Sequence, residues 1–169
     1  MKKFFLIGMP ASGKSRLGKH ISNKLNLKFI DLDDEIENFL QMKIIDIFNE
    51  KGEVFFRKME TSILSEIIKK YDEFIMATGG GTPHFNNNIS LINKSGISIF
   101  IDTDREILKE RILRNDKRPI FKGVKSLDLK LYEMYMDRIK SYSKSKYHLK
   151  KEFKEKVLSI INSYTKRKN

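Results

Sequence analysis

Residues 4–15 read FFLIGMPASGKS, and this stretch decides the fold. Residues 4–8 form a short apolar run that predicts a buried strand, and residues 8–15 match the pattern G-x-x-x-x-G-K-[ST] directly before a helical pattern. In such a loop the backbone N–H groups surround phosphate oxygens, and the start of the helix adds a partial positive charge. Lys14 can reach the terminal phosphates of a nucleotide, and the Ser15 hydroxyl can bind Mg²⁺. The stretch therefore predicts a nucleotide-phosphate site, with an ordinary glycine-containing turn as the alternative.

Short apolar runs alternate with helical patterns along the rest of the chain. Further strands are predicted at 27–30, 74–77 and 97–101, with a weak edge strand at 147–149. Helices are predicted at 15–25, 35–40, 44–48, 55–70, 105–113, 127–142 and 153–164, and another ends at 91–93. Strands that are separated by helices and buried on both faces predict an α/β fold with a parallel sheet and right-handed crossovers.

The organisation expected from this pattern is a single domain over residues 1–169. The basic stretch 115–126, which contains Pro119 and Gly123, is the best candidate for a mobile lid. A basic helix is expected at about 151–166.

Composition excludes several classes of protein. The chain of 169 residues is long enough for one domain with a real core. It has no cysteine, which excludes a disulfide scaffold, a zinc-thiolate site and a cysteine nucleophile. No apolar run approaches the roughly 18 residues that a membrane span needs. We therefore expect a cytoplasmic protein without a membrane partner.

The net charge of +12 comes largely from the end of the chain. Residues 139–169 hold ten Lys and Arg residues against Glu152 and Glu155. A basic segment of this kind can bind nucleic acid. Lysines on the outer face of a solvated helix are the more ordinary interpretation, and no RNA-binding aromatic motif accompanies the charge. We expect no nucleic-acid partner.

A cluster of carboxylates follows the second predicted strand. The sequence Asp31-Leu-Asp33-Asp34 lies at the carboxyl end of that strand, on the same edge of the sheet as the phosphate loop. The strand period of two places Asp31 and Asp33 on one side, where one could serve a metal ion through water and the other hold an acceptor hydroxyl. The alternative is that Asp33 or Asp34 caps the following helix.

Two more features follow in the chain. Arg57 comes after GEVFF at residues 52–56, and it is either functional or a surface residue in a routine helix pair with Glu60. Residues 78–81 read TGGG at the end of the third predicted strand. Consecutive glycines there would let the backbone approach a small ligand and offer N–H donors, or they form a loose loop. Each signal is weak alone, but their order after a phosphate loop is specific.

The combined order of these motifs resembles the shikimate kinase family over about residues 3–145. The matching pieces are residues 8–15, Asp31-Leu-Asp33, Gly52-Glu53 with Phe56-Arg57 and Glu60, residues 78–81, Arg111, Arg118-Pro119, and Arg138 with Tyr142. The resemblance implies a three-layer α/β sandwich, in which helices flank a five-stranded parallel sheet of order 2-3-1-4-5. It also implies transfer of the γ-phosphate of ATP to the 3-hydroxyl of shikimate, in the route to chorismate and the aromatic amino acids.

The resemblance further implies roles for individual residues. Lys14 and Arg118 would act on the transferring phosphate, and Asp33 would orient or deprotonate the acceptor hydroxyl. The implied ATP-binding residues are Gly8, Ala11, Ser12, Gly13, Lys14, Ser15, Arg16, Arg111 and Arg118. The implied shikimate-binding residues are Asp33, Arg57, Gly79, Gly80, Gly81 and Arg138. The implied cofactor is Mg²⁺, held by Ser15 and, through water, by Asp31. Within this scheme Arg111 would lie against the adenine, Glu60 would anchor the arginines, and the protein would act as a monomer.

The sequence departs from the family pattern in a few places. Ala11 stands where the family usually has glycine, and Ile120-Phe121 replaces a pair of leucines in the lid. The region after Tyr147 is shortened, which leaves the adenine-side contacts open. We expect His84, just after the glycines, to be a solvent-facing loop residue.

Two other functions remain as alternatives. One keeps a phosphoryl transfer but changes the acceptor to gluconate or a nucleoside monophosphate. The other is an ATP-binding regulatory or nucleic-acid-binding module that uses the basic end of the chain. Paired arginines at Arg57 and Arg138 together with Asp33 favour a carboxylated polyol as the acceptor.

Overall fold

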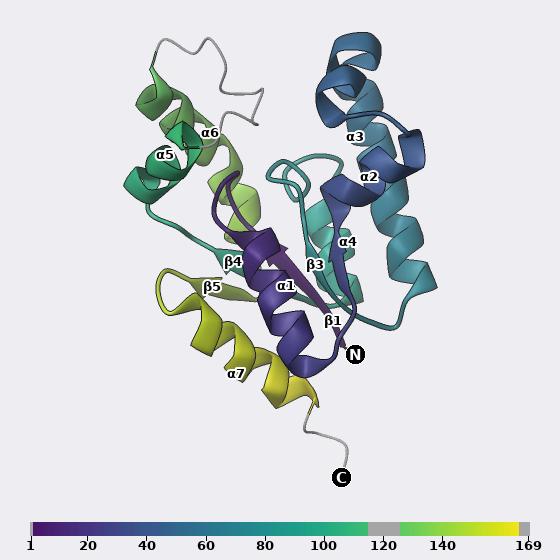
Figure 1. Cartoon of the computed structure of the whole chain (residues 1–169), viewed down its shortest axis with the longest axis vertical. Coiled ribbons are helices and arrows are strands. Elements are labelled where there is room, and N and C mark those ends of the chain that lie inside the picture. The colour runs from purple at the N-terminus through teal and green to yellow at the C-terminus, as the bar shows by residue number, and fades with distance from the viewer. Residues whose placement is uncertain (1, 115–125, 166–169) are drawn as a thin grey trace.

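A computed structural model describes residues 2–114 and 126–165 of the chain. At its centre is a parallel sheet of five strands in the order β2-β3-β1-β4-β5 (Figure 1). The strands are β1 (Lys2–Ile7), β2 (Phe29–Asp31), β3 (Glu73–Ala77), β4 (Ile97–Ile101) and β5 (Tyr147–Leu149). The helices are α1 (Lys14–Leu25), α2 (Leu32–Leu40), α3 (Ile44–Lys70), α4 (Asn88–Ser95), α5 (Arg105–Leu113), α6 (Leu127–Tyr142) and α7 (Phe153–Thr165). The predicted fold class and strand order are confirmed.

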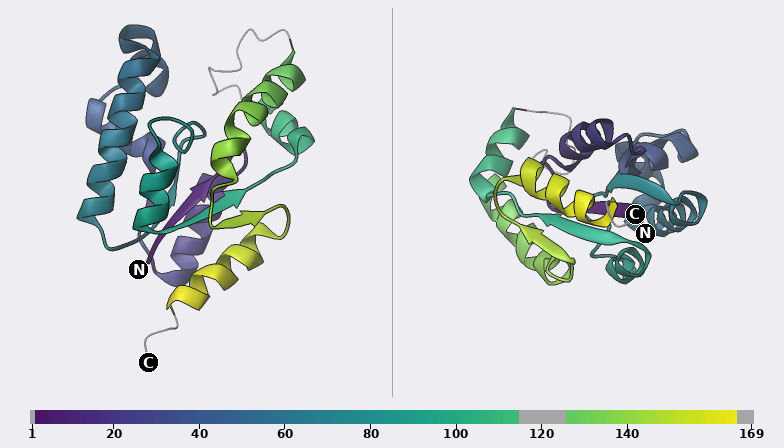
Figure 2. Two further views of the ribbon diagram at one scale, coloured as in Figure 1. Left: turned by 180° about the vertical axis from the view of Figure 1, so that it is seen from behind. Right: turned by 90° about the horizontal axis from the view of Figure 1, so that it is seen from below.

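Helices cover both faces of the sheet and make a three-layer sandwich (Figures 1 and 2). Successive side chains of a strand point to opposite faces, so every second residue of β1 belongs to the same layer. Phe4 and Leu6 pack in a cluster with residues of α1 and α7, whereas Phe5 and Ile7 pack with residues of α2, α3, α4 and α6. All four side chains are fully buried. This double burial explains why β1 reads as a continuous apolar run.

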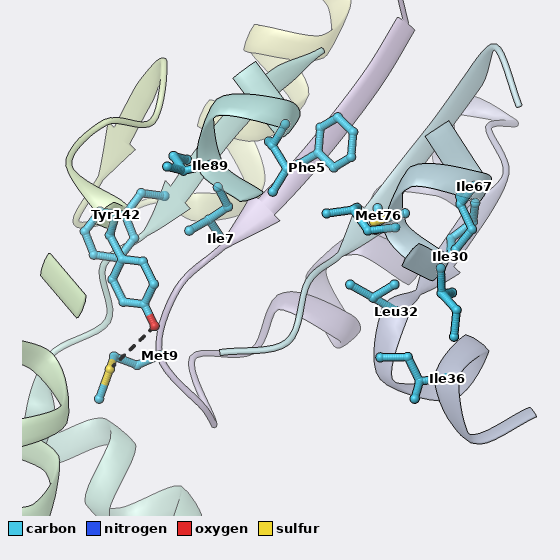
Figure 3. Packing of buried hydrophobic residues seen from close by; sticks show 14 of the residues in the cluster. Phe5, Ile7, Met9, Ile30, Leu32, Ile36, Ile67, Met76, Ile89 and Tyr142 are labelled. Atoms are coloured by element: carbon cyan, nitrogen blue, oxygen red, sulfur yellow. Dashed lines mark hydrogen bonds between the residues drawn. The ribbon is translucent and has the colours of Figure 1, made fainter. Parts of the chain in front are cut away.

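The larger of the two clusters lies on the face of the sheet that α2, α3, α4 and α6 cover. It runs from Ile36 and Leu32 on α2 past Met76 on β3 to Tyr142 at the end of α6 (Figure 3). Full burial of a large apolar side chain stabilises a fold by about 1.5–3 kcal/mol. The loop residue Met9 is itself part of this cluster, so the phosphate loop is anchored in the core.

The short helix 44–48 and the longer helix 55–70 predicted from the sequence form one element, α3, with a bend at Gly52. Gly52 has φ +79° and ψ 169°, which lie outside the helical region, while the residues on either side are helical. A left-handed φ is unfavourable for any residue with a Cβ atom, so glycine is required at this bend. The bend sets the direction of the segment that carries Arg57 and Glu60.

The structure corrects the interpretation of residues 31–34. The strand β2 ends at Asp31, and α2 begins at Leu32, so Asp33 lies in the first turn of a helix. The expected strand period of two therefore does not relate Asp31 to Asp33. The helix cap is Asp31, whose side chain accepts the Asp33 N–H at 3.1 Å, and not Asp33 or Asp34. A carboxylate that satisfies a helix-start N–H favours the helix over continued strand.

The helix α7 agrees with the interpretation that the lysines lie on the outer face of a solvated helix. Val157 and Ile161 of α7 are buried, while Lys154 and Lys156 are exposed. The predicted basic helix at 151–166 is thus α7, and position 166 lies outside the described residues. The predicted lid at 115–126 also lies outside them, apart from Ser126, which caps α6. Across the described part of the chain, no helix has the length and apolarity to cross a membrane.

The bend in α3 leads to a prediction about stability. Nothing lies within 4 Å of the position that a Cβ atom at Gly52 would occupy, so Gly52→Ala tests backbone conformation without a steric clash. We expect a loss of about 1–2 kcal/mol in the free energy of unfolding. Urea titration followed by circular dichroism measures it.

The control for this prediction is Lys51→Ala, one residue away on the exposed surface of α3. Its unfolding free energy should stay within about 0.5 kcal/mol of the original protein. Equal stability of the Gly52→Ala variant and the original protein would contradict the role given to the bend.

Candidate active site

The loop between β1 and α1 forms a cradle at a helix N-terminus. α1 starts at Lys14, and the Leu17 N–H donates to the Gly13 carbonyl at 2.9 Å, which makes Gly13 the cap. Thr103, just after β4, donates its hydroxyl to the Ser12 carbonyl at 3.1 Å and holds the loop from the other side. The Ser15 and Arg16 side chains are exposed at the first turn of the helix. This geometry agrees with the predicted phosphate site.

The Lys14 side chain is buried in the cradle, with only 7% exposed. Its ammonium group donates to the Gly8 carbonyl at 2.9 Å, to the Met9 carbonyl at 2.8 Å and to the Ser12 hydroxyl at 3.1 Å. The Lys14 side chain therefore folds back over the phosphate loop and places a positive charge at the centre of the loop. An anion that enters the loop meets this charge and the helix N-terminus together.

Ala11 and Arg111 meet at the tip of the loop. Ala11 has φ +65°, the left-handed conformation that glycine adopts without cost. The Arg111 guanidinium donates to the Ala11 carbonyl at 3.1 Å. Arg111 thus lies against the phosphate loop, while its expected contact with adenine stays a prediction.

The glycines at 79–81 touch each of the other predicted parts of the site. A Cβ atom at Gly79 would lie 2.7 Å from Asp33 Oδ1, and one at Gly80 would lie 2.7 Å from Pro10 Cδ of the phosphate loop. A Cβ atom at Gly81 would lie 2.6 Å from the Arg57 guanidinium nitrogens. The backbone can approach these groups so closely only because no side chain intervenes. The loop brings the Asp33 carboxylate, the phosphate loop and Arg57 to one place.

Arg57 is a buried residue, which excludes the surface alternative. It is 9% exposed, and its Nη1 donates to Glu60 Oε2 at 2.9 Å. Glu53 Oε1 accepts from Arg57 Nε at 3.1 Å and from Nη2 at 3.0 Å. The face of the guanidinium lies 4.1 Å from the centre of the Phe85 ring, a cation–π contact.

Glu60 anchors Arg57 from inside the protein, as predicted for one of the two arginines. Its side chain is fully buried, and its second oxygen accepts the Thr82 hydroxyl at 2.6 Å. Charged groups are rarely buried without a partner, and this carboxylate has an ion pair and a hydrogen bond. Arg57 is thereby fixed in one orientation beside the glycine loop.

Arg138 lies on α6, one turn before Tyr142, and is 7% exposed. Within the described part of the chain its Nε is a buried atom without a hydrogen-bond partner. Burial raises the pKa of Tyr142 to about 12, against the opposing charges of Arg138 and Arg57. The two arginines are linked to the same glycine loop, because Arg57 lies beside Gly81 and Tyr142, one turn after Arg138, donates to the Gly80 carbonyl.

Some contributors to the site had no functional assignment in the sequence. Glu53 was identifiable from its spacing of four residues before Arg57, a routine helix pair. Thr82, Phe85 and Thr103 carry no local signal, because the tertiary fold alone brings them to the site.

His84 is half-buried rather than solvent-facing, with Nε2 3.4 Å from Asp137 Oδ2. Partial desolvation, with the Asp31 and Glu37 carboxylates, raises the pKa of Asp34.

Arg118 lies outside the described residues, so its predicted contact with the transferring phosphate stays a prediction. No group of three or more His, Cys, Asp or Glu side chains that could hold a metal ion occurs within residues 2–114 and 126–165.

Comparison with known proteins gives consistent matches. The family model described as shikimate kinase matches residues 10–167. A shikimate kinase of Azobacteroides pseudotrichonymphae is 41% identical over 133 residues, 78% of each chain. A shikimate kinase of Clostridium botulinum is 37% identical over 170 residues, 98% of each chain. The solved structure of the Acinetobacter baumannii shikimate kinase in complex with shikimate has a TM-score of 0.88 and 27% identity, covering 99% of this chain and 95% of that one.

The left-handed backbone at Ala11 leads to a second stability prediction. Ala11→Gly removes an unfavourable Cβ contact, and we expect it to raise the free energy of unfolding by about 0.5–1 kcal/mol. Ala77→Gly makes the same chemical change at a buried position of β3 and should instead destabilise by about 1 kcal/mol. Paired urea titrations measure both, and a loss of stability in Ala11→Gly would contradict the strain assigned to this position.

Proposed function

This chain belongs to the shikimate kinase family, and we propose that the cradle, Asp33 and the arginine pocket bind the two reactants of that enzyme. The protein is an ATP-dependent kinase that transfers the γ-phosphate of ATP to the 3-hydroxyl of shikimate, giving shikimate 3-phosphate and ADP. The reaction belongs to chorismate and aromatic amino-acid biosynthesis. The observation that carries the assignment of residues is the glycine loop, which contacts Asp33, the phosphate loop and Arg57 at once.

ATP is proposed to bind with its phosphates in the cradle. The residues assigned to it are Gly8, Ala11, Ser12, Gly13, Lys14, Ser15, Arg16 and Arg111, with Arg118 added from the segment outside the described residues. The Lys14 ammonium already donates to three acceptors of the loop, so phosphate oxygens would replace acceptors that it holds. This exchange needs little rearrangement of the side chain, which supports rapid alignment of the γ-phosphate.

The donor set at this edge of the sheet fits Mg²⁺. Mg²⁺ binds through one or two protein oxygens together with waters and nucleotide phosphates. Ser15 offers a hydroxyl at the start of α1, and Asp31 offers a carboxylate at the end of β2. One oxygen of Asp31 already accepts the Asp33 N–H, so contact through water suits it better than direct binding. Bound with ATP, the ion would neutralise charge on the phosphates.

Shikimate is proposed to bind with its carboxylate between Arg57 and Arg138. A guanidinium group matches a carboxylate with two parallel hydrogen bonds, and the buried Arg138 Nε has a donor to offer. The backbone of Gly79, Gly80 and Gly81 lines the same pocket. Two buried arginines favour a small acid over a neutral sugar, because only the acid can pair with the guanidinium groups.

Asp33 is proposed to hold the acceptor hydroxyl and to receive its proton. The oxygen–hydrogen bond of the hydroxyl breaks as its oxygen forms a bond to the γ-phosphorus, while the bond from that phosphorus to the bridging oxygen of ADP breaks. The proton passes to the Asp33 carboxylate. Asp33 lies in the first turn of α2, beside Gly79 of the glycine loop.

The proposed reactants are two small molecules, and every assigned residue comes from one chain. A monomer without a nucleic-acid partner remains part of the proposal. The lid and the single domain over residues 1–169 remain part of the proposal.

The substrate is tested by an acceptor panel. Purified protein with ATP and Mg²⁺ should release ADP when shikimate is added, and at least about a hundredfold more slowly with gluconate or a nucleoside monophosphate, because neither places a ring carboxylate between the arginines. A coupled assay for ADP measures the rates. Folded protein that releases no ADP with shikimate, or releases it faster with gluconate, would reject the assignment.

The role of Asp33 is tested by a matched pair of substitutions. Asp33→Asn should lower kcat by about a hundredfold or more, because the amide cannot take the proton, and should leave ATP binding within about twofold. Asp34→Asn changes the adjacent, exposed carboxylate and should keep kcat within about twofold. Steady-state kinetics and nucleotide titration measure both variants. Equal loss of activity in the two variants would contradict a specific role for Asp33.

A further inference from the structure

Tyr142 occupies a junction between the two halves of the site. It is the last residue of α6, and its side chain is fully buried. Its hydroxyl donates to the Gly80 carbonyl at 2.5 Å and lies 3.9 Å from the sulfur of Met9, the second residue of the phosphate loop (Figure 3). One phenol therefore touches both the loop proposed to bind shikimate and the loop proposed to bind ATP.

The bond to Gly80 also determines where a neighbouring N–H points. A peptide unit is planar and trans, so the carbonyl of Gly80 and the N–H of Gly81 point in opposite directions. Tyr142 holds the carbonyl toward α6 and thus directs the Gly81 N–H away from that helix. Burial keeps the hydroxyl protonated over the working range of the protein, because the pKa of Tyr142 is about 12. The hydroxyl is a permanent donor.

The carbonyls of the glycine loop are all committed to the protein itself. Gly79 accepts from the Thr82 N–H at 3.2 Å, and Gly81 accepts from the His84 N–H at 2.9 Å. Gly80 accepts from Tyr142. Among the hydrogen bonds of the described chain, the loop takes part through these three acceptors and not through the N–H groups of Gly80 and Gly81. The three carbonyls of the loop are therefore occupied within the described residues, which leaves the N–H groups of Gly80 and Gly81 among its remaining hydrogen-bonding groups there.

Arg138 connects the same phenol to the proposed carboxylate pocket. It precedes Tyr142 by four residues on α6, so the two side chains lie on one face of the helix. Its buried Nε has no partner within the described chain, and an unsatisfied buried donor is costly. A hydroxyl that fixes the end of α6 against Gly80 also fixes the position from which Arg138 reaches an anionic ligand.

We propose that Tyr142 is a positioning residue for the acceptor: its hydroxyl holds the Gly80 carbonyl against the end of α6, so that the glycine loop and Arg138 keep a fixed separation at the proposed shikimate carboxylate site. This inference rests on the proposed function. It assigns to Tyr142 no contact with the reacting atoms. Its effect falls on the affinity for shikimate rather than on the chemical step.

The test is Tyr142→Phe, which removes the hydroxyl and keeps the ring that packs 5.0 Å from the Phe100 ring. We expect KM for shikimate to rise about tenfold, the effect of losing one buried hydrogen bond to the loop. The values of kcat and of KM for ATP should stay within about twofold, because Met9 contacts the phenol only through a weak sulfur acceptor.

The matched control is Tyr164→Phe on α7, away from the site. It removes a hydroxyl that lies 3.2 Å from the Tyr147 hydroxyl. It should leave both KM values unchanged. The unfolding midpoint of each variant and a calorimetric titration with shikimate in the absence of ATP accompany the kinetics. Weaker calorimetric binding by Tyr142→Phe, with kcat retained, supports the proposal.

Three results would overturn the inference. An unchanged KM and an unchanged calorimetric Kd for shikimate in Tyr142→Phe would show that the hydroxyl positions nothing. An equal rise of both KM values with a large drop in the unfolding midpoint would indicate a structural role alone. Failure of the original protein to use shikimate would reject the proposed function first, and this inference with it.

Discussion

A packing constraint at residues 79–81 holds the site together. Three consecutive positions leave no room for a Cβ atom, and the group that would clash differs at each: a carboxylate at Gly79, the phosphate loop at Gly80 and a guanidinium at Gly81. The backbone of this loop thus sets the distance between the phosphate cradle and the acceptor pocket. At Gly80 the neighbour is the Pro10 ring, and at Gly81 it is an arginine that ion pairs with Glu53 and Glu60 hold in place, so these contacts are rigid. A phosphoryl transfer, which depends on alignment more than on covalent chemistry, benefits from that rigidity.

Electrostatics complements this packing. Arg57 is shared between Glu53, which is half-exposed, and Glu60, which is fully buried, so its charge is neutralised before any ligand arrives. Arg138, by contrast, has a buried nitrogen without a partner in the described chain. The pocket therefore combines one arginine whose geometry is fixed by acidic neighbours with another whose hydrogen-bonding capacity is incomplete. Arg57 presents a guanidinium group in a fixed orientation. Arg138 presents a buried N–H donor that an anionic ligand can satisfy.

The parts of the fold that the sequence predicts well are those that local chemistry determines. The phosphate loop, the alternation of strands and helices, and the buried strands follow from a motif and from apolar runs. Other features depend on competition between neighbours in space. Asp31 was placed with Asp33 by a strand period, but its capping bond starts the helix one residue later. From its sequence position, Arg57 could be either a functional residue or a surface residue. The fold decides this, because it places Glu53, Glu60 and Phe85 around the side chain. The importance of Tyr142 depends on Gly80, 62 residues away in the chain, which no local pattern reveals.

The central position of β1 has a consequence for synthesis of the chain. β1 leaves the ribosome before both of its partners, because it pairs with β3 from residue 73 and with β4 from residue 97. At about 5–20 residues per second, its apolar edge waits several seconds for its partners. During that interval residues 4–7 are a segment prone to aggregation, and Lys2 and Lys3 flank it as charged gatekeepers. Lys2 and Lys3 thus protect the nascent strand until β3 and β4 have been synthesised.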